Sequence, residues 1–129
     1  MTNPKAPASS KPRTTQRRVD EWEVISPLLS AIYSEFQSLA KKKPDALVSK
    51  QKIDMVNKIL ETCREVLADE PQLRFLSLID RDDVPRTDDL VIMLSLYSSA
   101  METFQKRYYL HVEGILGLDD GQWIWNVER

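Results

Sequence analysis

The most apolar stretch of the chain runs from residue 87 to residue 112 and predicts one long helix. Its apolar positions alternate in steps of three and four, the spacing that lines one helix face: Leu90, Leu94, Tyr97, Met101, Phe104 and Tyr108. Val91, Ile92 and Leu96 fall outside this stripe, so the first half is apolar nearly all round. A helix of that kind is usually buried. We expect either the central core element or a helix with a partner-binding face.

An earlier stretch, residues 20–42, shows the same periodicity. Its stripe consists of Trp22, Ile25, Leu29, Ile32, Phe36 and Leu39. Asp20 and Glu23 have the spacing of a capping box, which places a helix start near Asp20. Pro27 removes a backbone hydrogen bond inside a helix, or else stands at the first helical position after Ser26. We therefore predict a kinked or broken start, with residues 26–42 as the firm part.

A third periodic stretch follows the short connector 44–48. Ser49 has the position of an N-cap, and the helix is expected to end near Asp69, before Pro71. Its stripe consists of Ile53, Val56, Leu60, Cys63 and Leu67. A connector this short makes the two helices antiparallel neighbours.

Residues 72–86 fit a short helix or a strand, and a short helix is favoured because no clear strand elsewhere offers a partner. Thr87 is expected to cap the long helix, with Asp88 and Asp89 in its first turn. Gly114 is expected to end that helix. The remaining segment contains two tryptophans around an Asp-Asp-Gly turn signal. It folds back as a hairpin or a short helix, or it docks on another chain.

These stretches predict an all-α protein: an antiparallel bundle of three long helices with a short fourth helical segment. Residues 1–18 read as a disordered basic arm, 19–113 as the bundle with coiled-coil-like stripes, and 114–129 as a Trp-containing C-terminal tail. The arm is rich in proline and contains no acidic residue, and it has too few apolar residues to offset the entropy of ordering.

Composition narrows the class of protein. The length of 129 residues leaves room for one domain. The net charge is −2, so the rest of the chain is acidic enough to balance the basic arm. The single cysteine, Cys63, excludes an internal disulfide and suits a buried thiol in a reducing compartment. No stretch approaches the roughly 18 apolar residues of a transmembrane helix, and no apolar segment follows the basic N-terminus as in a secretory signal. We expect a cytoplasmic protein without a membrane partner.

The chain offers no convincing catalytic constellation. It has three glycines, one cysteine and one histidine, so glycine-rich phosphate loops and Cys/His metal motifs are missing, and no cofactor or metal is expected. The acids from Asp80 to Asp89 begin like a calcium-binding loop. However, Pro85 and Val91 stand where that loop needs glycine and glutamate. We read these acids as a solvated turn before a helix.

One short segment, residues 107–111, resembles the Arg/His motif of HEPN ribonucleases, which are small helical proteins that act as dimers. Here three residues separate Arg107 from His111, one fewer than that motif's minimum. The resemblance covers five residues. It implies a ribonuclease in which two such pairs come together in a dimer, and we keep it as a third hypothesis.

The leading hypothesis is a non-enzymatic interaction or adaptor subunit. It would self-associate into an oligomer, or dock on a larger complex, through the long helix and the tail. The candidate partner-binding residues are Val91, Ile92, Leu96, Trp123, Ile124 and Trp125. The alternative is a small nucleic-acid-associated regulator that uses the basic arm. The candidate contacts on phosphates or an acidic partner are Lys5, Lys11, Arg13, Arg17 and Arg18.

Overall fold

A computed structural model describes residues 11–112 and 121–128 of the chain. It contains three α-helices, α1 (Gln16–Lys42), α2 (Lys50–Val66) and α3 (Thr87–Tyr108). A short 3-10 helix, η2 (Pro71–Phe75), follows α2, and two strands, β1 (Tyr109–Val112) and β2 (Gln122–Trp125), follow α3. The protein is thus mostly helical with a small two-stranded sheet, so the predicted all-α class holds only in part.

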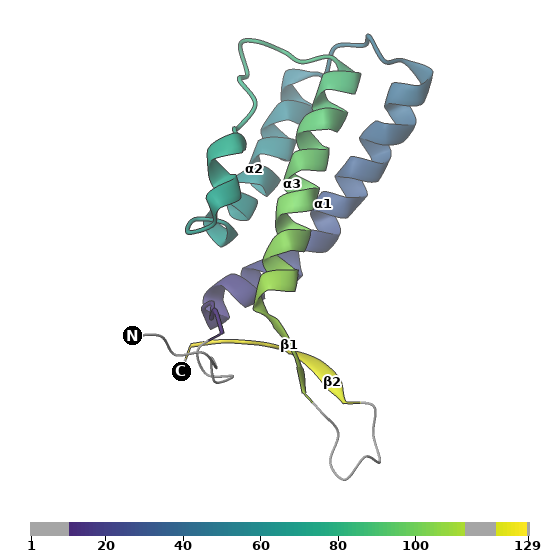
Figure 1. Cartoon of the computed structure of the whole chain (residues 1–129). Coiled ribbons are helices and arrows are strands. Elements are labelled where there is room, and N and C mark those ends of the chain that lie inside the picture. The colour runs from purple at the N-terminus through teal and green to yellow at the C-terminus, as the bar shows by residue number, and fades with distance from the viewer. Residues whose placement is uncertain (1–10, 113–120, 129) are drawn as a thin grey trace.

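The three helices pack side by side, but they do not all alternate in direction. α1 is antiparallel to both α2 and α3, and α2 and α3 run the same way (Figure 1). The predicted fully antiparallel bundle is therefore wrong for the α2–α3 pair. The reason lies in residues 76–86, which return along the bundle as an extended segment after the single 3-10 turn of η2.

The predicted apolar stripes form the core. The whole α3 stripe is buried, and so is the whole stripe from Ile53 to Leu67. In α1, Ile25, Leu29 and Phe36 are buried, while the other three stripe residues are partly buried against the core. Ser49 caps α2 as predicted, since its hydroxyl accepts a hydrogen bond from the Lys52 backbone N–H.

Two predicted helix starts are wrong. α1 begins at Gln16 rather than near Asp20, with Thr15 as N-cap, and it continues through Pro27 without a break. Pro27 and Glu23 are both exposed. Proline removes one helical donor, and at an exposed position water can take its place. At α3 the N-cap is Arg86, while Thr87 opens the helix and donates its hydroxyl to the Ala46 carbonyl of the α1–α2 connector.

The predicted helix end at Gly114 is also wrong, because α3 ends at Tyr108 and the chain turns into β1. β1 pairs antiparallel with β2 in the register Tyr109 with Trp125 and His111 with Trp123. The tail supplies one strand of a hairpin, and the other strand comes from residues 109–112, which were predicted to be helical. Gly121 precedes β2 with φ of 79°, and a Cβ there would collide with the Val112 backbone oxygen, so the turn requires glycine.

The arm's predicted boundary at residue 18 is too late. Thr14 is buried, and its backbone exchanges hydrogen bonds with the C-terminal segment: its N–H donates to Asn126 O, and its carbonyl accepts from Glu128 N–H. Residues 1–10 of the arm lie outside the described residues. The described part of the chain therefore begins beside the C-terminal segment that follows β2 (Figure 1).

Candidate functional site

The hairpin is fixed to the bundle by Trp125. Its ring lies 5.1 Å from that of Trp22 in an edge-to-face arrangement and 5.9 Å from that of Phe104, centroid to centroid. Its indole N–H donates a 3.0 Å hydrogen bond to the carboxylate of Glu23 on α1. The Trp22 indole donates in turn to the Met101 carbonyl of α3, at 2.9 Å. Trp125 therefore belongs to an aromatic junction between α1, α3 and the sheet, and not to a free surface.

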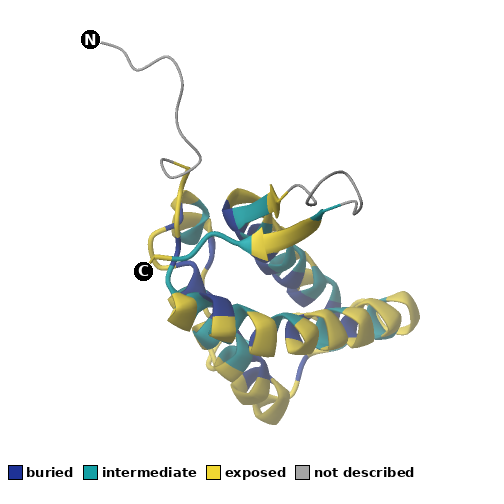
Figure 2. Cartoon of the chain, turned by 90° about the horizontal axis from the view of Figure 1, so that it is seen from below, coloured by how far each residue is buried: buried dark blue, intermediate teal, exposed yellow. Residues whose placement is uncertain are grey.

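Trp123 sits two residues earlier on the same face of the sheet, but farther from the bundle. Its side chain is 62% exposed, although its ring contacts those of Tyr109 and His111 at 6.0 and 5.2 Å. On the opposite face, Ile124 and Val112 are each 42% exposed. The hairpin leaves the lower ends of the helices (Figure 1), and its strand residues are largely exposed (Figure 2). The outer half of the hairpin, which carries Trp123, Ile124 and Val112, thus presents apolar side chains to solvent on both faces.

The three predicted contact residues on α3 separate in the same way. Val91 is partly buried against the core, whereas Ile92 and Leu96 are 62% and 48% exposed. Ile92 and Leu96 line a groove of about 250 Å³ between α3 and the segment 75–77. Phe75, which is 67% exposed, lies on the other wall, and Asp89 lies among the lining residues. Sequence reasoning missed Phe75 because its segment gave no clear periodicity.

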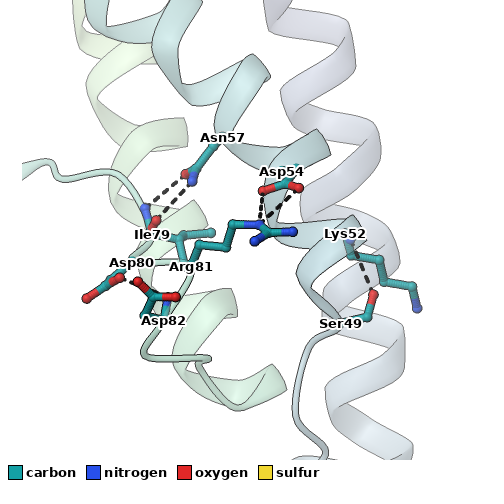
Figure 3. Close-up of polar contacts among 8 residues, drawn as sticks. All are labelled: Ser49, Lys52, Asp54, Asn57, Ile79, Asp80, Arg81 and Asp82. Carbon is teal, nitrogen blue, oxygen red and sulfur yellow. Dashed lines mark hydrogen bonds and ion pairs between the residues drawn. The ribbon is translucent and has the colours of Figure 1, made fainter.

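The extended wall of this groove is held by side chains instead of by a neighbouring strand. The Tyr97 hydroxyl donates to the Ser77 carbonyl at 2.7 Å, and the Arg64 guanidinium donates to the Leu76 carbonyl. The Asn57 amide bonds both the N–H and the carbonyl of Ile79 at 2.9 Å (Figure 3). These bonds fix the wall, so the groove is preformed.

Two arginines of the predicted basic arm form ion pairs within the protein. Arg17 pairs with Glu21 at 3.3 Å, and Arg18 pairs with Asp69 at 2.6 Å. Lys11 and Arg13 are exposed, and Lys5 lies outside the described residues. The ion pairs of Arg17 and Arg18 reduce the positive charge available to a polyanion.

A buried acid joins the lower ends of the helices. Glu70 is 5% exposed, and its carboxylate accepts hydrogen bonds from the Tyr108 hydroxyl at 2.7 Å and the Arg107 guanidinium at 3.3 Å. Burial, and then the bond and charge of Glu70, raise the pKa of Tyr108 to about 12. The acid has two donors inside the protein, so this cluster serves to connect elements.

The single cysteine and the two residues of the HEPN-like segment lie on three different elements. Cys63 is fully buried, and burial raises the pKa of its thiol to about 12, which keeps it protonated at neutral pH. Arg107 lies on α3 and His111 lies on β1, so the two residues of the HEPN-like segment do not share the helix on which they were expected. Among residues 11–112 and 121–128, no group of three or more acidic, histidine or cysteine side chains is arranged to hold a metal ion.

Comparisons with protein-family profiles, curated proteins and solved structures give no match to this chain. Within the described residues, no helix is long and apolar enough to cross a bilayer. Two exposed apolar features, the hairpin and the groove along α3, are the candidate contact surfaces.

Proposed function

We propose that the protein is a non-enzymatic interaction subunit that docks on another protein chain through the outer half of its hairpin. The observation that carries this proposal is the exposure of Trp123 on a strand whose other tryptophan is anchored to the bundle. Tryptophan is among the residues that contribute most to binding energy at protein interfaces. Here it is presented on a backbone already held by strand pairing and by Trp125, so a partner orders little on binding.

The surroundings of Trp123 support docking better than the other uses of an exposed aromatic residue. Ile124 and Val112 add apolar surface on the opposite face, so a partner can contact the hairpin from both sides. Stacking of nucleic-acid bases on Trp123 would need basic side chains beside it. The backbone of the segment that carries Lys11 and Arg13 instead lies against Asn126, whose amide donates to the Lys11 and Pro12 carbonyls, beyond the anchored Trp125.

The test compares Trp123→Ala with Leu28→Ala, a control on α1 that is 49% exposed and lies on another element. The mass of the protein is measured by light scattering over a range of concentrations, and again in complexes captured from its own cell extract. Trp123→Ala should weaken self-association or partner recovery by about tenfold or more, because loss of an interface tryptophan costs about 2 kcal/mol or more. Helical content should stay unchanged. Equal behaviour of both variants and the unaltered protein would remove the hairpin as the docking element.

A further inference from the structure

The groove between α3 and the segment 75–77 has chemistry that narrows its occupant. Its apolar floor and walls include three exposed side chains, Phe75, Ile92 and Leu96. The wall is held in place by Tyr97, Arg64 and Asn57, as described above. The groove is therefore a built apolar surface whose exposed side chains come from two elements far apart in sequence.

The spacing along α3 suits a helical partner. Ile92 and Leu96 are one turn apart, and side chains four residues apart on a helix are neighbours at about 5–6 Å. A second helix laid beside α3 presents apolar side chains at the same interval, which is how amphipathic helices fill grooves. Phe75 closes the side opposite α3.

The groove has an excess of negative charge where α3 begins. Asp89 lines the groove, Asp88 precedes it, and Asp82 and Asp83 lie on the turn that leads from the extended wall to α3. Within the part of the chain that the structure describes, none of these four carboxylates has a cation within ion-pair distance. The two arginines of this region are engaged elsewhere, since Arg81 pairs with Asp54 and Arg86 with Asp45.

The wall opposite α3 carries a cation. The Arg74 guanidinium stacks over the Phe75 ring at 4.7 Å from its centroid. Carboxylates thus gather at the α3 start of the groove, and the cation beside Phe75 belongs to the opposite wall. This polarity favours a partner with lysine or arginine beside its apolar stripe, aligned so that its cations lie near the start of α3.

We infer that this groove binds a basic amphipathic helix of a partner protein, with its apolar stripe on Phe75, Ile92 and Leu96 and its cations beside Asp89. The inference rests on the proposed role as an interaction subunit, but it concerns a surface separate from the hairpin. A result against Trp123 leaves the groove standing, and a result against the groove leaves the hairpin standing.

The test uses the full chain and two fluorescein-labelled synthetic helical peptides of about 18 residues, five turns. One peptide carries leucine on one face and lysine on the other, and its counterpart carries glutamate in place of lysine. Fluorescence anisotropy gives the affinity of each. The lysine peptide should bind at least about tenfold more tightly than the glutamate peptide, because like charges at an interface cost affinity.

Substitutions in the protein test whether the peptide binds in the groove. Leu96→Ser should weaken the lysine peptide by about tenfold, whereas Leu28→Ser should leave its affinity unchanged. The two leucines are 48% and 49% exposed on different helices, so general loss of surface apolarity affects both alike. Asp89→Asn should weaken binding of the lysine peptide, while binding of the glutamate peptide should be unchanged or slightly tighter. Equal binding of the two peptides, no binding, or equal effects of the two leucine variants would overturn the inference.

Discussion

The hydroxyl of Tyr108 donates a 2.7 Å hydrogen bond to the carboxylate of Glu70, which is 5% exposed. Tyr108 is the last residue of α3, and Glu70 lies between α2 and η2. The bond therefore ties the point where α3 becomes β1 to the turn that follows α2. Because the hairpin leaves the bundle at this point, the bond also helps to place Trp123 and Trp125.

Tyr108→Phe should lower the free energy of unfolding by about 1–3 kcal/mol, since a hydrogen bond to a charged and buried acceptor is lost. The midpoint of urea unfolding, at unchanged slope, measures this loss. Tyr33→Phe is the control, because no described residue forms a hydrogen bond with the Tyr33 hydroxyl. The Tyr33 ring is partly buried against the core, whereas that of Tyr108 is buried. A loss for Tyr33→Phe as large as that for Tyr108→Phe would contradict this account of the bond.

Truncation of the two tail tryptophans should change the free energy of unfolding by very different amounts. Trp125→Ala should lower the unfolding free energy by about 2–4 kcal/mol, because the ring fills the junction between Trp22 and Phe104 and its indole loses Glu23. Trp123→Ala should change it by less than about 0.5 kcal/mol, as for exposed positions in general. Thermal unfolding followed by circular dichroism compares the two. A larger loss for Trp123→Ala would mean that Trp123 supports the fold instead of a partner contact.

The extended segment should loosen when its tether is cut. Asn57→Ala removes both hydrogen bonds to Ile79 and should cost about 1–3 kcal/mol of unfolding free energy. Amide hydrogen exchange at Ile79 should rise more than at buried amides of α3. Lys58→Ala, a change of the exposed neighbour on α2, serves as control and should leave exchange at Ile79 as it is. Unchanged protection of Ile79 in Asn57→Ala would remove the tether from the account.

Cys63 should make the protein sensitive to alkali. Its pKa is raised from 9.0 to about 12 in the folded state, so between these values the unfolded chain ionises its thiol and the folded chain does not. The stability from the neutral buried thiol is intact below pH 9. It is lost as pH rises toward 12, by about 1.4 kcal/mol per pH unit and about 4 kcal/mol in all.

The slope of unfolding free energy against pH, measured between pH 8 and 10, tests this sensitivity. Cys63→Ala should lose the part of the slope that begins near pH 9, whatever its overall stability. The tyrosines with raised pKa, Tyr97 and Tyr108, add slope chiefly above their ordinary value of 10.0, so the two proteins are compared below pH 10. This limit matters because Cys63 itself contributes to the raised pKa of Tyr97. A thiol that reacts rapidly with a disulfide reagent in the folded protein would contradict the assigned burial.

The apolar stripes were predictable because periodicity follows directly from burial on one helix face. The α3 stripe from Leu90 to Tyr108 is buried throughout. The start of α1 was not predictable, because Thr15 is followed by arginines that the helix dipole disfavours, and Asp20 with Glu23 imitates a capping box. The ion pairs of Arg17 with Glu21 and of Arg18 with Asp69 offset that unfavourable charge. The pair of Arg18 with Asp69 joins residues far apart in the sequence.

The end of α3 depends on contacts that local sequence does not encode. Tyr109 to Val112 continue an apolar helical pattern, yet they form a strand because Trp125 pairs with Tyr109 and packs on α1 and α3. The candidate surfaces could be predicted only as sets. Val91 is as apolar as its neighbour Ile92, and Trp125 is of the same type as the nearby Trp123. Only the packed structure separates the inward residues, Val91 and Trp125, from the exposed ones.

The central claim, that the outer half of the hairpin contacts a partner chain, is tested most directly by photo-cross-linking at position 123. Trp123 is replaced by the photoreactive residue p-benzoylphenylalanine, which keeps a large aromatic side chain there. The same residue at the exposed α2 position Glu61 is the control. After irradiation in the source cells, position 123 should give a defined adduct with one protein, or with a second copy of the chain, that Ile124→Ser diminishes. No adduct at position 123 beyond that at position 61 would contradict the claim.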